Sequence, residues 1–185
     1  MNPLAVTFDN CLMTEVAFHN IEATVNALSL GHVIVKHSWD YIQQLYRQFL
    51  ITAGEFCSVC NVGIRVALYR IARQFNIGLI VSGRSGRTEA NSPKEFFCCS
   101  PGYFYKIGRN FMSRKETYGF MYFNQIQRGL WNMMKSPYFI ELPSYMPWRE
   151  DDMLTIMKEN INWEGRLGEQ HADCRMNDAK EYLKL

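Results

Sequence analysis

Two cysteines at a C-x-x-C spacing, Cys57 and Cys60 in "EFCSVC", are the residues of this chain best suited to chemistry. They come at the predicted start of a helix, where free backbone amides and the positive end of the helix dipole favour thiolates. Metal binding and disulfide exchange both require thiolates. The spacing alone leaves three interpretations open: a redox pair, half of a metal site, or two small side chains buried at a turn.

A third cysteine, Cys174, ends the polar segment "EQHADC" far along the chain, where packing offers little reason to bury it. With Cys57 and Cys60 it makes a set of three thiolates. Such a set can hold a [4Fe–4S] cluster with one iron left open, or a zinc ion if His171 or water is the fourth ligand. The sequence therefore predicts a metal site at Cys57, Cys60 and Cys174.

A second group of candidate residues lies in "SGRSGRTEA". Ser82 and Gly83 end an apolar run that predicts a strand, and Arg84 and Arg87 follow it. Open α/β sheets bind their ligands beyond the carboxyl ends of their strands. Two arginines there could hold a phosphate through paired hydrogen bonds. The alternative is a solvated basic loop.

The elements that must position these residues alternate between apolar strands and amphipathic helices. Continuous β-prone runs predict buried strands at residues 3–8, 32–36 and 78–83. Helices are expected from Thr14 to about Leu28, from Ser38 or Asp40 to near Gly54, and after the C-x-x-C to Phe75. This order predicts an α/β fold, a Rossmann-like parallel sheet with helices on both faces.

The composition changes after Gly83, and residues 84–113 are rich in glycine, serine, arginine and aromatic residues. Residues 84–113 are predicted to form loops with short elements, followed by a helix from Glu116 to Lys135. From Pro137 onward we expect a helical and irregular C-terminal tail. Within it, "LPSYMPW" is predicted to be a loop and Arg149 to about Asn160 a helix.

Length and charge set broad limits on the chain. With 185 residues, of which 48% are hydrophobic, it suits one globular domain. We assign residues 1–92 to the α/β core and residues 93–185 to an extension that packs on the same core. A net charge of +2 does not demand a polyanionic partner. No secretory signal and no run of 18 apolar residues is visible, so we expect a cytoplasmic protein without a membrane partner.

Two stretches, "NPLAVTFDN" and "GEFCSVCNVGIRVALYRIARQFNIGLIVSGRSGRTEA", resemble the core of the PP-loop ATP pyrophosphatase superfamily. The nearest groups are the tRNA 2-thiocytidine synthetases, with a C-x-x-C just before a helix containing Leu-Tyr-Arg, and the N-acetyl sugar amidotransferases, with a similar "LAVTFDN" strand. The resemblance covers about residues 2–92 and returns at "HADC".

The resemblance implies an enzyme that uses ATP and Mg to adenylate a substrate oxygen, releases pyrophosphate, and lets sulfur or nitrogen displace the adenylate. The implied substrate is a tRNA base or a nucleotide-linked sugar. A sulfur or ammonia donor protein is the implied partner, and a homodimer is left open. In the thiolating branch a three-cysteine iron–sulfur cluster takes part, and Cys57, Cys60 and Cys174 match its ligands.

The resemblance also implies where a nucleotide would bind. Phe8, Asp9 and Asn10 match the family's loop near the adenine and ribose. Ser82 and Gly83 match the strand end beside the nucleotide, and Arg84 would be their neighbour.

One segment of the family is missing from this sequence. The signature S-G-G-x-D-S, whose amides bind the pyrophosphate, should lie one strand and one helix before "NPLAVTFDN" and does not occur. The first predicted strand is therefore the family's second, and Cys11 stands where "FDNG" would have glycine. Three functions stay open: a PP-loop-type enzyme or its C-terminal portion, a catalytically inactive metal-binding interaction domain, or a thiol–disulfide redox protein using Cys57 and Cys60.

Overall fold

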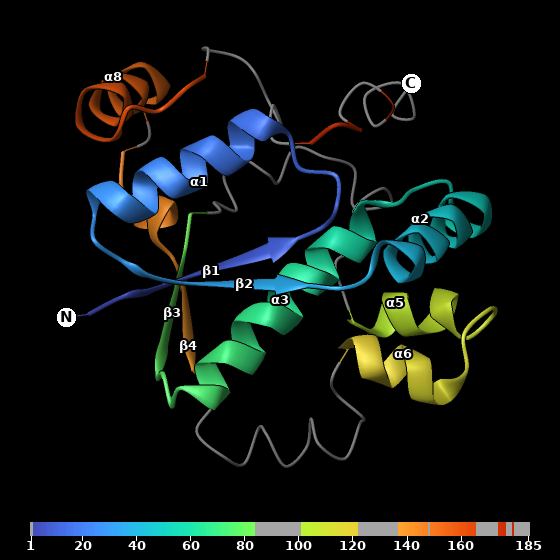
Figure 1. Cartoon of the computed structure of the whole chain (residues 1–185). Helices are drawn as coiled ribbons and strands as arrows, with labels where there is room; N and C mark the ends of the chain where they lie inside the picture. Colours follow the sequence, from blue (N-terminus) through green and yellow to red (C-terminus); the bar gives the residue numbers. More distant parts are fainter. Residues whose placement is uncertain are drawn as a thin grey trace. The chain divides into compact units, whose positions relative to one another are not determined.

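The computed structural model describes residues 2–83, 101–121, 137–147, 149–165, 174–176 and 179. The chain divides into two compact units. The first unit combines residues 1–36 with residues 147–185, and the second comprises residues 37–146. Figure 1 gives the helix and strand labels. Within the described residues, no helix has both the length and the apolar character needed to cross a membrane.

The first unit is built on a strand–helix–strand motif. Strands β1 (Leu4–Asp9) and β2 (Gly31–Lys36) pair in parallel, with Leu4 opposite Gly31 and Asp9 opposite Lys36. Helix α1 (Glu15–Ala27) connects them and lies along the pair (Figure 1). Its first turn is capped by Thr14, whose Oγ1 accepts a hydrogen bond from the Ala17 amide at 3.2 Å.

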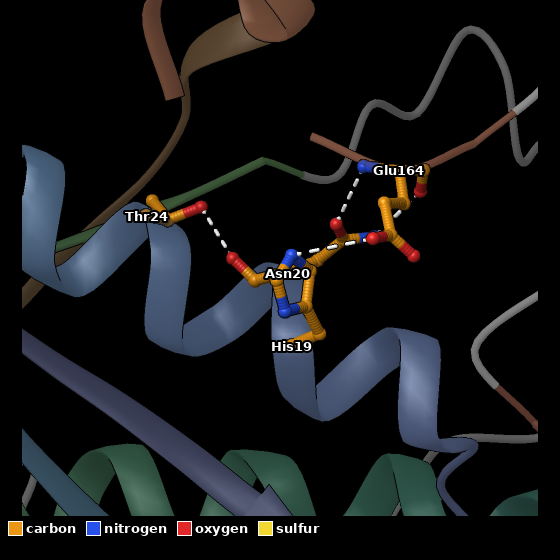
Figure 2. Close-up of polar contacts among 4 residues, drawn as sticks. All are labelled: His19, Asn20, Thr24 and Glu164. Atoms are coloured by element: carbon orange, nitrogen blue, oxygen red, sulfur yellow. Dashed lines mark hydrogen bonds and ion pairs between the residues drawn. The ribbon is translucent and has the colours of Figure 1, made fainter. Parts of the chain in front are cut away.

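A later part of the chain joins this motif. Helix α8 (Glu150–Ile161) packs against α1, and the segment after α8 is held by Asn20 on α1. The Asn20 carboxamide donates to the Glu164 carbonyl at 2.7 Å and accepts from the Glu164 amide at 2.8 Å. Figure 2 shows both bonds, together with the 3.5 Å ion pair between His19 and Glu164. Asn20 is buried, and a buried carboxamide needs hydrogen-bond partners. The two bonds give one to its nitrogen and one to its oxygen.

The second unit is mainly helical. Its elements are α2 (Trp39–Ala53), α3 (Cys57–Gln74), β3 (Leu79–Ser82), α5 (Pro101–Gly108), α6 (Arg114–Met121), β4 (Tyr138–Glu141) and a 3-10 turn, η1 (Leu142–Tyr145). Helix α2 ends at Gly54, which adopts a left-handed conformation with φ 68°. Only glycine adopts that conformation without steric cost, so the glycine sets the end of the helix.

An aromatic cluster forms the core of this unit. Phe49, Phe104 and Phe120 come from α2, α5 and α6, and each is almost completely buried. The Phe104 ring lies 4.9 Å from both the Phe49 ring and the Phe120 ring. Such rings contribute large apolar areas to a core, which explains how two short helices attach to α2 and α3.

Strands β3 and β4 form a second parallel pair, with Leu79 opposite Tyr138 and Ser82 opposite Glu141. No backbone ladder connects this pair to β1 and β2 within the described residues. The sequence predicts a helical and irregular tail from Pro137 onward, whereas residues 138–141 form strand β4. They do so because β3 supplies the backbone hydrogen-bond partners that an isolated four-residue segment lacks.

The structure thus confirms a mixed α/β fold and most of the predicted elements. Helices α1, α2 and α8 agree with their predicted bounds to within a residue or two. In place of one sheet, the described strands form two parallel pairs. The predicted domain boundary after residue 92 and the second half of the predicted helix at 116–135 lie outside the described residues.

Candidate functional site

The C-x-x-C motif forms the first turn of α3. Cys57 is the first residue of the helix, and Cys60 lies one turn further along on the same side. Both are partly exposed and both are thiols. A helix N-terminus favours thiolates through its free amides and dipole, so this is where nucleophilic or metal-binding sulfur is expected.

The Cys60 thiol has an aromatic partner from another helix. Its Sγ lies 3.0 Å from the hydroxyl of Tyr46 on α2. The Tyr46 ring is itself held edge-on against Phe56, with ring centroids 6.1 Å apart. Tyr46 is buried, so its hydroxyl is fixed where it can donate to a Cys60 thiolate or accept from the thiol. No local sequence signal links Tyr46 to Cys60, because the contact depends on how α2 and α3 pack.

A buried carboxyl group caps the same turn. Glu55 Oε2 accepts a hydrogen bond from the Ser58 amide at 2.9 Å, whereas the N-cap residue Phe56 supplies no side-chain cap. Glu55 is only 8% exposed, and its Oε1 makes no hydrogen bond within the described part of the chain. Burial raises the pKa of Glu55, and the amides of Ser58 and Cys57 partly oppose this. In the sequence, the position of Glu55 just before the predicted helix start indicates this capping role.

Phe8, Asp9 and Asn10, the residues predicted to lie near the adenine and ribose, are at the carboxyl end of β1. Phe8 and Asp9 are buried. Asp9 Oδ2 pairs with Lys36 Nζ at 2.8 Å, and Asp9 Oδ1 accepts from the Cys11 amide at 2.8 Å. Asn10 Oδ1 accepts from the Leu12 amide, also at 2.8 Å. The hydrogen bond and charge of Asp9 raise the pKa of Lys36.

Cys11 occupies the position where the resembled family would have glycine. Its backbone is left-handed, with φ 62°, a conformation that glycine adopts freely and other residues adopt at a cost of about 1–2 kcal/mol. Burial, followed by the charge of Asp9, raises the pKa of the Cys11 thiol, although the charge of Lys36 opposes them. Cys11 therefore adopts the left-handed backbone conformation that glycine would favour at this position of the loop.

Cys174 lies beside this same loop, in the first unit. It forms an isolated antiparallel bridge with Met13, and the next residue, Arg175, donates its amide to the Leu12 carbonyl at 2.8 Å. Cys57 and Cys60 belong to the second unit. Among the described residues, no three Cys, His, Asp or Glu side chains gather as metal ligands. His171, the suggested fourth ligand, lies outside those residues.

Ser82 and Gly83 lie where the sequence predicted, at the end of a strand. Ser82 is the last residue of β3, opposite Glu141 of β4. Arg84 and Arg87, the predicted phosphate clamp, lie outside the described residues.

Comparison with known proteins found no family model and no curated protein that matches this chain. A function is therefore inferred from its residues and their geometry.

Proposed function

We propose that this chain is a PP-loop-type protein that takes part in ATP-dependent transfer of sulfur or nitrogen to a tRNA base or a nucleotide-linked sugar. The observation that carries the proposal is the thiol pair on the first turn of α3, with Cys60 Sγ 3.0 Å from the Tyr46 hydroxyl. The pair has the position and the chemistry that sulfur transfer requires.

The first unit supplies further support. Its parallel β1–α1–β2 motif places Asp9 at the end of β1 and Asn10 directly after it, and the carboxyl ends of strands are where α/β proteins bind nucleotides. A single Rossmann-like sheet is part of the proposal and requires a further strand to join the two parallel pairs. In this proposal Phe8, Asp9 and Asn10 lie near the adenine and ribose, and Ser82, Gly83, Arg84 and Arg87 near the phosphates.

Two of the proposed metal ligands fit the group they would hold. Cys57 and Cys60 are thiols on one side of a helix, and the Tyr46 hydroxyl can donate to a bound thiolate and so orient it. With Cys174 they would hold a [4Fe–4S] cluster or a zinc ion. When bound, a cluster with one open iron supplies a site for sulfur, whereas zinc would stabilise the fold.

Anaerobic reconstitution of the full chain with iron and sulfide tests the metal site. We expect visible absorption that is lost in Cys57→Ala, Cys60→Ala and Cys174→Ala. The matched control is Cys11→Ala, which removes a cysteine outside the predicted set and should leave the absorption unchanged. A colourless protein with one zinc per chain indicates the inactive metal-binding domain instead. Equal metal content in all four variants contradicts the metal site.

A thiol–disulfide redox protein is the second candidate, favoured by the position of Cys57 as the first residue of α3. In that reaction a thiolate attacks a substrate disulfide, and the second thiolate resolves the mixed disulfide, so the substrate leaves as a dithiol and Cys57–Cys60 becomes a disulfide. Reduction of a model disulfide distinguishes the two. Redox function predicts activity that Cys174→Ala keeps and Cys57→Ala loses, whereas the metal proposal predicts no such activity.

A further inference from the structure

A cavity of about 140 Å³ lies within the second unit, apart from the thiols and from the predicted nucleotide residues. Helix α2 and the turn between α5 and α6 form its walls. The side chains that matter here are Tyr41, Gln44 and Gln48 from α2, Phe111 and Met112 from the turn, and Glu116 from α6. Pockets for drug-sized ligands typically exceed about 300 Å³, so this cavity suits a single small ring.

The aromatic walls of the cavity are held in place by core packing. The Phe111 ring meets the buried Phe49 ring edge-on, with centroids 6.0 Å apart. The Tyr41 ring packs on Phe120 and His37, at 6.1 Å and 5.6 Å, and its hydroxyl donates to the Glu116 carbonyl at 3.4 Å. A planar ligand would therefore meet aromatic rings that are already positioned, which lowers the entropic cost of binding.

A reciprocal capping box holds the acidic wall. The Ser113 amide donates to Glu116 Oε2 at 2.8 Å, and the Glu116 amide donates to Ser113 Oγ at 3.2 Å. These bonds fix the turn that carries Phe111 and Met112. They also lower the pKa of Glu116, so its carboxylate is an acceptor at neutral pH.

Two glutamines line the cavity and offer carboxamide groups for hydrogen bonding. Gln44 and Gln48 are one turn apart on α2, and neither side chain bonds to another described residue. A carboxamide offers a donor and an acceptor to the edge of a base, and a carboxylate such as Glu116 accepts from an exocyclic amino group. Stacking rings with amide and carboxylate groups are how proteins bind unstacked bases.

The charge of the chain is unevenly divided between the two units. Residues 37–146 contain 13 Lys and Arg against six Asp and Glu, a net charge of +7, whereas the remainder contains seven against 12, a net charge of −5. Three exposed cations adjoin the cavity residues in sequence: Arg47 beside Gln48, Arg109 near Phe111, and Lys115 beside Glu116. A positive unit attracts polyanions, and cations beside a base site can meet flanking phosphates.

We propose that this cavity binds one unstacked base of a single-stranded RNA, with Arg47, Arg109 and Lys115 contacting the neighbouring phosphates. The choice of RNA rests on the proposed function and deepens it, since it selects the tRNA base over the nucleotide-linked sugar as substrate. The cavity itself involves none of the predicted metal ligands.

Fluorescence anisotropy of the full chain with a labelled single-stranded RNA of about 12 nucleotides tests the site. Phe111→Leu keeps an apolar side chain against Phe49 but removes the stacking ring, and we expect about tenfold weaker binding. Gln44→Ala and Gln48→Ala change only side chains outside the core and should each weaken binding. Unchanged affinity in all three variants overturns the base site.

The phosphate contacts predict a salt effect. Replacing Arg47, Arg109 and Lys115 together by alanine should lower the slope of log affinity against log salt by about 2, since each phosphate contact to a single strand contributes about 0.7. Lys158→Ala, which removes a cation from α8 in the first unit, is the matched control and should leave the slope unchanged. Equal slopes in both variants overturn the role of these three cations.

Competitors decide the class of ligand. If duplex RNA competes for the protein as well as the single strand does, the proposal is overturned. If a mononucleotide competes equally well, the proposal is also overturned, and the result favours a nucleotide-linked substrate. Tighter binding of single-stranded DNA of the same sequence overturns the choice of RNA. Cys57→Ala should bind RNA normally. The RNA site and the metal site can thus fail separately, one by anisotropy and the other by cluster absorption.

Discussion

Asn20 on α1 and Glu164, which follows α8, exchange two hydrogen bonds although 144 residues separate them in the chain. The Asn20 side chain uses its donor and its acceptor on the backbone of Glu164 and so mimics one step of a strand ladder (Figure 2). The backbone carbonyl of Asn20 separately accepts from Thr24 Oγ1 at 2.7 Å. One carboxamide thus attaches a distant segment to α1.

Asn20→Ala should lower the free energy of unfolding by about 1–3 kcal/mol, because it removes both hydrogen bonds that the buried Asn20 side chain makes to the backbone of Glu164. Urea denaturation followed by circular dichroism measures the effect. His19→Ala is the matched control: it removes only an ion pair whose side chains are 46% and 58% exposed, so its effect should stay below about 0.5 kcal/mol. An equal loss in both variants contradicts the role given to Asn20.

Gly54→Ala should destabilise the second unit through the backbone alone. Gly54 has φ 68°, and an added Cβ would meet no atom within 4 Å. The expected loss is about 1–2 kcal/mol, the cost of a left-handed conformation for alanine. Gly78→Ala is the matched control, since its Cβ also meets no atom within 4 Å and its φ is not in the left-handed region. Thermal unfolding should therefore distinguish the two variants.

The helices could be predicted from sequence because their ends depend on nearby residues. Thr14 caps α1 through a bond to a residue three positions away, and Gly54 ends α2 through its own backbone freedom. Strand β4 could not be predicted in this way. A four-residue strand is defined by its partner, and β3 lies far earlier in the chain.

The candidate site shows the same division between local and distant information. Cys57 and Cys60 are visible from their spacing, and the loop after β1 from "FDN". The partners of these residues come from packing. Tyr46 hydrogen-bonds to Cys60 from another helix, and Lys36 forms an ion pair with Asp9 from the neighbouring strand. Neither partner has a sequence pattern that points to it.

Glu55 and Glu116 should affect stability with opposite pH dependence. Burial raises the pKa of Glu55, so its contribution is fully present below the ordinary value of 4.5 and is lost as pH rises through the folded-state pKa. Hydrogen bonds lower the pKa of Glu116, so its contribution is present above 4.5 and is lost as pH falls. Urea denaturation of metal-free protein from about pH 2.5 to about pH 8 should show wild type losing stability relative to Glu55→Gln as pH rises above 4.5. By contrast, wild type should lose stability relative to Glu116→Gln as pH falls below 4.5.

Tyr41 should titrate later than an ordinary tyrosine. Burial, followed by the charge of Glu116, raises its pKa from 10.0 to about 12. Its contribution to stability is therefore fully present below pH 10 and is lost as pH rises from about 10 to about 12. A pH jump followed by tyrosinate absorbance, read before the chain unfolds, should show a component near pH 12 that Tyr41→Phe removes. If the absorbance lost in Tyr41→Phe instead titrates near pH 10, the half-buried placement of the Tyr41 side chain beside Glu116 is wrong.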